Sequence, residues 1–138
     1  MNLNQFIGRS QLSAMKSASR GEGGQYFREM MRALTGKIAT MPKTYDTSEM
    51  GDEAPITLHY FHGGSDWYII EKDVGDPEDE TQGIQAQAFG FACLNGDTEN
   101  AEFGYINIQE LIENGVELDL YYTPETVGTI KNRFDKAA

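Results

Sequence analysis

The sequence predicts an α+β fold: a mainly antiparallel sheet of about five strands, with helices before it and one or two helices at the end of the chain. Three observations predict this fold. Apolar residues recur with a helical period over residues 27–34. The period changes to the alternation typical of strands in residues 55–61. Residues 123–134 return to helical spacing after a capping sequence.

The first forty-odd residues are predicted to form two helices. Residues 3–17 have a rough helical period, and residues 19–24 are rich in glycine, which indicates a hinge. In the second helix Phe27, Met30 and Leu34 lie on one face together with Met31. We interpret this stripe as a packing face.

The middle of the chain is predicted to form a hairpin followed by a third strand. Ile56, Leu58 and Tyr60 are expected on one side of a single strand, and residues 62–65 form the turn before the returning strand 66–71. An acidic loop follows, and residues 84–94 form the third strand, with a bulge possible at its glycine.

The last third alternates strands and helices. A short strand over residues 103–106 runs into a helix that Asn107 caps, with Glu110 as the capping-box partner. Residues 116–122 are predicted as the fifth strand. Thr123 is then expected to cap the last helix, because proline and glutamate follow it in the first turn.

The length of 138 residues is typical of one domain. We expect residues 1–43 to form a basic helical N-terminal extension and residues 44–138 an acidic α+β domain, together one compact unit. Cys93 is the single cysteine and lies in an apolar run, so we interpret it as a buried residue in a reducing cytoplasm. No signal peptide and no membrane span are predicted.

Charge is distributed very unevenly along the chain. Between Thr44 and Tyr122, eighteen aspartates and glutamates accompany one base, Lys72, whereas residues 1–43 carry a net charge of +5. The net charge of the whole chain is −11. This acidity argues against non-specific binding of nucleic acid or anionic lipid by the whole molecule and favours a basic protein partner. Nucleic acid is expected to bind only through residues 1–43.

The acidic residues of two loops are predicted to form a partner-binding surface. Spaced along strands and loops, carboxylates can approach the charge density of a nucleic-acid backbone and occupy the basic channel of a nucleic-acid-binding enzyme. The alternative is that these are ordinary solvated loops on different faces; residues 46–53 would form a third such group. The predicted surface consists of Asp66, Asp73, Asp76, Glu78, Asp79, Glu80, Asp97, Glu99 and Glu102.

No cofactor, metal site or catalytic residue is predicted. His59 and His62 are separated by three residues and would face opposite sides of a strand, so one metal ion could not easily bind both. We interpret them as a solvent-facing strand histidine and a hairpin histidine. The acidic loop 73–83 lacks the spacing of an EF-hand. No serine or cysteine nucleophile has a local base.

The order and spacing of several short segments resemble an uncharacterised bacterial family, domain of unknown function 2958, over about residues 34–123. Its members are carried largely by plasmids and phages, so the resemblance implies a mobile-element setting and a small acidic α+β domain, with no implied reaction. The matching residues are Tyr45, Gly51, Asp52, His59, Tyr60, Phe61, Asp66, Trp67, Tyr68, Glu71, Asp73, Phe89, Gly90, residues 103–106, Leu111 and residues 118–121.

Three hypotheses of function follow. The first is a non-catalytic binding protein of a mobile element that mimics nucleic acid and engages a basic host protein such as a restriction or CRISPR-type defence enzyme. The second is a small enzyme that uses His59 or His62 with Asp66 beside Trp67 and Tyr68. The third is a nucleic-acid accessory protein that contacts phosphates through residues 1–43. The basic helices could instead neutralise the acidic sheet, within the fold or in a homodimer.

Overall fold

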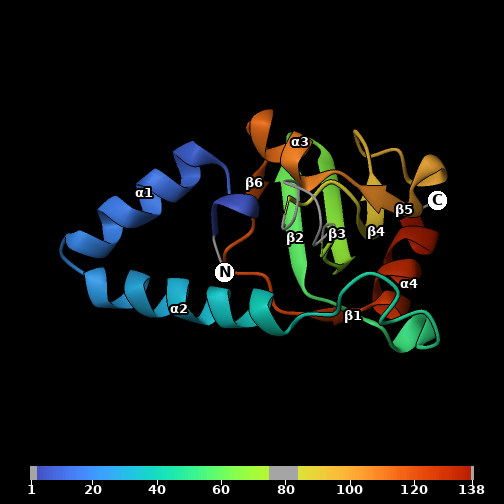
Figure 1. Ribbon diagram of the computed structural model, residues 1–138. Helices are drawn as coiled ribbons and strands as arrows, with labels where there is room; N and C mark the ends of the chain where they lie inside the picture. Colours follow the sequence, from blue (N-terminus) through green and yellow to red (C-terminus); the bar gives the residue numbers. More distant parts are fainter. Residues whose placement is uncertain (1–2, 75–83, 138) are drawn as a thin grey trace.

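The computed structural model describes residues 3–74 and 84–137, which form helices around a central sheet (Figure 1). The helical elements are η1 (Leu3–Gln5), α1 (Arg9–Arg20), α2 (Gly24–Thr40), η2 (Gly51–Glu53), η3 (Thr98–Asn100), α3 (Ile108–Glu113) and α4 (Val127–Ala137). The strands are β1 (Pro55–Ile56), β2 (Leu58–His62), β3 (Ser65–Glu71), β4 (Ala88–Cys93), β5 (Glu102–Ile106), β6 (Glu117–Leu118) and β7 (Glu125–Thr126). Among these described residues, no helix combines the length and apolar character that crossing a membrane requires.

The main sheet has five strands in the order β5-β4-β3-β2-β6, and each neighbouring pair is antiparallel. A second, two-stranded sheet pairs β1 with β7. The predicted α+β class and the mainly antiparallel sheet of five strands are therefore confirmed. The β2–β3 hairpin turns at Gly63 and Gly64, and Gly63 has a φ of 56°, which glycine adopts without steric cost.

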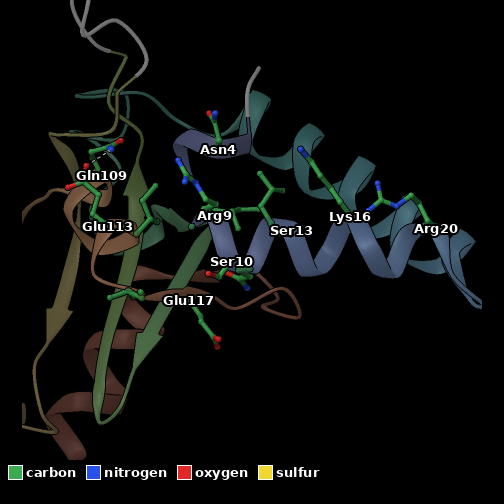
Figure 2. A pocket seen from close by; sticks show the side chains of 16 residues that line it. Asn4, Arg9, Ser10, Ser13, Lys16, Arg20, Gln109, Glu113 and Glu117 are labelled. Atoms are coloured by element: carbon green, nitrogen blue, oxygen red, sulfur yellow. Dashed lines mark hydrogen bonds between the residues drawn. The ribbon is translucent and has the colours of Figure 1, made fainter.

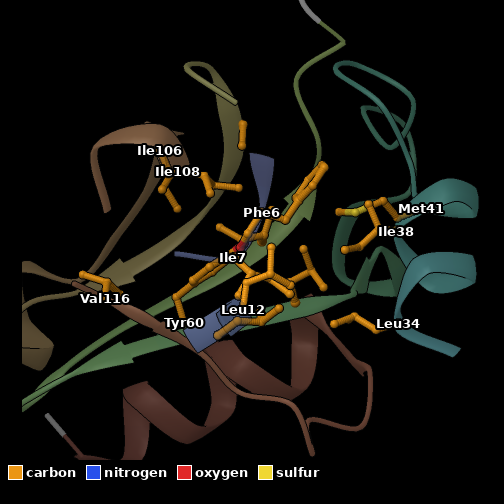
Figure 3. Close-up of a cluster of buried hydrophobic side chains, with 14 of the residues drawn as sticks. Phe6, Ile7, Leu12, Leu34, Ile38, Met41, Tyr60, Ile106, Ile108 and Val116 are labelled. Atoms are coloured by element: carbon orange, nitrogen blue, oxygen red, sulfur yellow. The ribbon is translucent and has the colours of Figure 1, made fainter. Parts of the chain in front are cut away.

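Each face of the main sheet contributes to a separate hydrophobic core. In the first core, on one face of the sheet, Leu58, Tyr60 and Ile69 pack with residues of η1, α1, α2 and α3 (Figure 3). In the second core, on the other face, Tyr68 and Phe91 pack with residues of α4. The sheet is therefore covered on both faces, and each core contains residues that are 0 % exposed.

Residues 9–40 form a helical hairpin of α1 and α2 (Figure 1). Apolar residues of both helices, and of the preceding residues 3–7, enter the first core. Phe6 and Ile7 are buried there, and the Tyr60 hydroxyl donates to the Phe6 carbonyl at 2.5 Å. The Gln11 side chain donates to the Leu118 carbonyl at 2.7 Å and accepts from the Leu118 N–H at 2.9 Å, so α1 covers an edge of the short strand β6. The N-terminal helices therefore dock through apolar packing and through hydrogen bonds between side chains and backbone groups.

Lys72, the base within the acidic stretch, fastens the end of α2 to the sheet. Its ammonium group is buried and donates to the carbonyls of Ile38 (2.8 Å) and Ala39 (3.2 Å). A cation is favoured at the C-terminus of a helix, where carbonyls lack helical partners. Burial, followed by repulsion from Lys43, lowers the pKa of Lys72.

Three local expectations need correction. Ile56 does not share a side with Leu58 and Tyr60, because the strand breaks at Thr57 and Ile56 packs in the opposite core. The fifth strand is limited to Glu117–Leu118. The last helix begins after β7, and the Thr126 hydroxyl, rather than Thr123, accepts from the Thr129 N–H at 3.2 Å.

The predicted Asn107 cap is confirmed, since its side chain accepts from the Glu110 N–H at 2.9 Å. The register irregularity near Gly90 lies on β3, between Ile69 and Glu71, rather than on β4. Gly90 itself is needed for close approach, because a Cβ at this position would lie 2.0 Å from the Tyr68 carbonyl oxygen.

Candidate functional site

Part of the predicted acidic surface gathers at one end of the main sheet. Asp66 is the second residue of β3 and is paired with Cys93 at the end of β4, and Glu102 begins β5 opposite Ala92. Asp97 and Glu99 lie in the connection between β4 and β5 and are exposed. We call Asp66, Asp97, Glu99 and Glu102 the acidic end.

The remaining predicted residues do not join this group among the described residues. Asp73 follows the opposite end of β3, seven residues from Asp66, a separation of about 23 Å along an extended strand. Asp66 and Asp73, which the predicted surface combines, therefore lie at opposite ends of β3. Asp76, Glu78, Asp79 and Glu80 lie outside the described residues.

The acidic end holds two carboxylates close to one buried thiol. Burial raises the pKa of Cys93, and the carboxylates of Asp66 and Asp97 raise it further. The Asp97 side chain also accepts from the Asn100 N–H and thereby caps η3, which fixes the loop that carries Glu99. Cys93 is 2 % exposed, so its prediction as a buried residue is confirmed.

The basic N-terminal helices do not neutralise this end through direct contacts. Within the described parts of the chain, no lysine or arginine lies within ion-pair distance of Asp97, Glu99 or Glu102. Among the residues that the structure describes, lysine and arginine form two ion pairs, Lys131–Asp52 (2.9 Å) and Arg133–Glu125, both involving α4. The exposed carboxylates of Asp97, Glu99 and Glu102 are thus not paired with a described lysine or arginine and can meet a partner.

His59 forms a hydrogen-bond network with two carboxylates, and the residues next to it in the sequence do not predict this network. Its Nε2 lies 2.7 Å from Asp66 Oδ1, and its Nδ1 lies 3.1 Å from Asp119 Oδ2. Tyr68 stacks on the imidazole with ring centroids 4.7 Å apart. The side chain of His59 is 15 % exposed, so the expectation of a solvent-facing strand histidine is wrong.

This network is better suited to holding structure than to proton transfer. Both ring nitrogens of His59 lie within hydrogen-bond distance of a carboxylate oxygen, so neither is free to contact a substrate. Trp67 packs on the opposite face of the sheet, in the first core, and does not line this site. Burial, followed by the Asp66 carboxylate, raises the pKa of Tyr68. His62 is exposed in the hairpin.

Asp119 was not predicted as part of any site, because it lies sixty residues from His59 and comes near it only through the pairing of β6 with β2. The sequence offered one indication that Asp119 lies on a strand, its place in residues 116–120, where apolar and acidic residues alternate. In the described portion of the chain, no group of three or more His, Cys, Asp or Glu side chains is arranged to hold a metal ion.

A groove of about 860 Å³ lies between α1 and the segment from α3 to β6 (Figure 2). Arg9, Lys16 and Arg20 line it from α1. Their spacing places them within about 40° of one another around the helix and over about 16 Å of its length. Glu113 and Glu117 lie on the opposite wall. We call Arg9, Lys16 and Arg20 the α1 basic stripe; none of the three has an ion-pair partner among the described residues.

A second cavity, of about 400 Å³, lies between residues 44–54 and the second face of the sheet. Four of its fourteen lining residues are aromatic, and the buried Glu71 also lines it; we call it the aromatic cavity. Sequence reasoning missed this cavity, because residues 44–54 have no period that would place them against the sheet. Its aromatic residues are Tyr45, Phe89, Phe103 and Tyr105.

Comparisons with protein-family models, curated proteins and solved structures give no match to this chain. The resemblance to the mobile-element family therefore stays a prediction, and the assignment of function depends on the geometry of the sites.

Proposed function

We propose that the protein is a non-catalytic binding module that engages a basic protein through its acidic end. The observation that carries the proposal is the gathering of Asp66, Asp97, Glu99 and Glu102 at one end of the sheet without a described lysine or arginine to pair Asp97, Glu99 or Glu102. Carboxylates that are exposed and share a sign attract a cationic surface and accelerate its association.

The carboxylates of the acidic end surround the end of the sheet. Asp66 shares a face with its partner Cys93, Glu102 shares the opposite face with its partner Ala92, and two strand spacings separate their backbones by about 10 Å. Asp97 and Glu99 extend the array beyond the strand ends. A nucleic-acid-binding enzyme with a basic channel fits this surface, and a host defence enzyme of the restriction or CRISPR type is our candidate. The mobile-element setting comes from the sequence resemblance alone.

The enzyme hypothesis has less support, because both nitrogens of the His59 imidazole contact carboxylates. We also propose that the binding module acts in the cytoplasm, where a buried free thiol such as Cys93 stays reduced.

Neutralising three carboxylates of the acidic end should weaken binding to the basic partner about 10- to 100-fold. The variant is Asp97→Asn, Glu99→Gln and Glu102→Gln, which keeps side-chain shape. Each lost charge pair is worth about 0.5–1 kcal/mol at an exposed site, and 1.4 kcal/mol is tenfold in affinity. The matched control, Glu22→Gln, Glu29→Gln and Glu53→Gln, removes the same net charge elsewhere. An equal loss in both variants would show that only net charge matters.

The α1 basic stripe favours a second function, contact with nucleic-acid phosphates by the N-terminal helix. Arg9, Lys16 and Arg20 are exposed and share one side of α1 (Figure 2). A helix face with three cations can contact several phosphates along a strand. In this reading the acidic end meets a protein while α1 meets the nucleic acid.

Replacing the stripe with glutamine should weaken the binding of a 20-nucleotide single-stranded DNA, measured by retardation, and should reduce the slope of log affinity against log salt by about 2. The variant is Arg9→Gln, Lys16→Gln and Arg20→Gln. The control variant, Arg32→Gln, Lys37→Gln and Lys43→Gln, loses the same charge from α2 and the segment that follows it. Equal retardation of the two variants, or no retardation by the unmodified protein, rejects this second function.

A further inference from the structure

A buried carboxylate, that of Glu71, is among the groups that line the aromatic cavity. Glu71 is 4 % exposed. Its Oε1 accepts from the Tyr45 N–H at 2.9 Å, and its Oε2 accepts from the Thr47 N–H at 2.9 Å and the Thr47 hydroxyl at 2.5 Å. An ionised carboxylate offers about four acceptor positions, so one position on Oε1 is left for a ligand.

The negative charge of Glu71 has no cationic partner in the described structure. Lys131, the base that lines the cavity, pairs with Asp52 at 2.9 Å. These two carboxylates and one ammonium group give the lining a net charge of −1. A buried charge without a partner is costly, which makes the cavity complementary to a single positive charge.

The walls of the cavity are suited to a flat, weakly hydrated cation. Tyr105 packs edge-to-face on Phe89 with ring centroids 6.1 Å apart, and Phe103 also lines the cavity. Aromatic faces attract cations through their quadrupole, and guanidinium groups stack on them while donating hydrogen bonds to carboxylates. An anion in this cavity would be repelled by the carboxylates of Glu71 and Asp52.

Tyr45 is held over the cavity in a strained conformation. Its φ is 73°, in the left-handed region that residues other than glycine rarely adopt. The backbone N–H of this residue is fixed by Glu71, and its hydroxyl lies 3.1 Å from the Tyr105 hydroxyl. Tyr45 is nevertheless 70 % exposed, so burial does not explain the strain. Strain of this kind is found at ligand-binding sites.

We infer that this cavity binds the guanidinium group of an arginine side chain from a bound peptide, with Glu71 accepting a hydrogen bond and Phe103 and Tyr105 stacking on the cation. The site goes beyond the proposed function, because Glu71 and Asp66 lie at opposite ends of β3 and the acidic end takes no part in it. The two proposals can therefore fail independently.

Titration with small probes followed by NMR tests the inference. N-acetyl-arginine methylamide should shift the backbone amide signals of Tyr45 and Thr47, and should bind at least 10-fold more tightly than the citrulline analogue, which has the same shape without the charge. The lysine analogue should bind more weakly than arginine, because an ammonium is more strongly hydrated. Equal binding of citrulline, or tighter binding of lysine, would overturn the assignment.

Variants of the cavity wall separate a real site from a surface effect. Phe103→Leu and Tyr105→Leu should each lower the affinity for the arginine probe at least 5-fold; both side chains are partly exposed, at 37 % and 58 %, so the fold should tolerate the change. Tyr121→Leu, a tyrosine that is 67 % exposed and does not line the cavity, is the control and should leave affinity unchanged. Shifts that map to the acidic end, or affinities unaffected by the wall variants, reject the site.

Discussion

Deletion of residues 1–43 is expected to abolish the cooperative unfolding transition of the remaining chain. Burying one large apolar side chain stabilises a fold by about 1.5–3 kcal/mol, so seven such side chains contribute about 10–20 kcal/mol. Whole domains have a net stability of about 5–15 kcal/mol. The buried apolar side chains that the deletion removes from the first core are Phe6, Ile7, Leu12, Met15, Leu34, Ile38 and Met41.

Thermal unfolding followed by circular dichroism measures this effect. The control is the glutamine variant of the α1 basic stripe, which changes charge but leaves the core side chains and should unfold cooperatively near the temperature of the unmodified protein. A sharp transition for residues 44–138 alone would show that the sheet does not need the N-terminal helices. Because the deletion should remove the fold, loss of DNA binding on deletion would not identify a nucleic-acid site, and point variants are needed.

Replacing Gly90 with alanine is the single substitution expected to destabilise the sheet most. The added Cβ would lie 2.0 Å from the Tyr68 carbonyl oxygen and 3.1 Å from the Ile69 Cα, and neither backbone atom can move without opening the β3–β4 pairing. Strain of this size costs about 3–5 kcal/mol. The melting temperature should therefore fall by more than about 10 °C.

Gly104 supplies a matched control for this prediction. It is paired with Gly90 across the β4–β5 ladder, and a Cβ at Gly104 would meet nothing within 4 Å. Gly104→Ala should be neutral or stabilise the protein by about 0.5–1 kcal/mol, because alanine has less freedom to lose on folding. A Gly90→Ala protein as stable as Gly104→Ala would contradict the close approach of β3 and β4.

Features determined by neighbouring residues were predictable from the sequence. The hairpin at Gly63 and Gly64 and the cap at Asn107 depend on a few consecutive residues, and both are confirmed. The α+β class followed from the order of helical and strand periods. In contrast, Thr123 fits the pattern of a cap, yet β7 pairs with β1 and delays the last helix to Val127.

Features that depend on distant parts of the chain were not predictable. The break at Thr57 moves Ile56 to the second core, because β1 leaves the main sheet to pair with β7. Asp119 reaches His59 only through the β2–β6 pairing, and the cavity at Glu71 forms only when the irregular residues 44–54 fold against β3. For the same reason, the sequence placed Asp66 and Asp73 in one group although β3 separates them.

The central claim is that the acidic end, rather than net acidity, selects a basic partner. The basic protein that the unmodified chain retains most strongly from host cells is first purified. The most direct measurement is then the Kd of its complex with the unmodified chain at several salt concentrations. We predict that added salt weakens the binding steeply and that the Asp97, Glu99 and Glu102 variant binds at least 10-fold more weakly, while the Glu22, Glu29 and Glu53 control stays within about 2-fold. Binding that is insensitive to salt, or an equal loss in both variants, would contradict the claim.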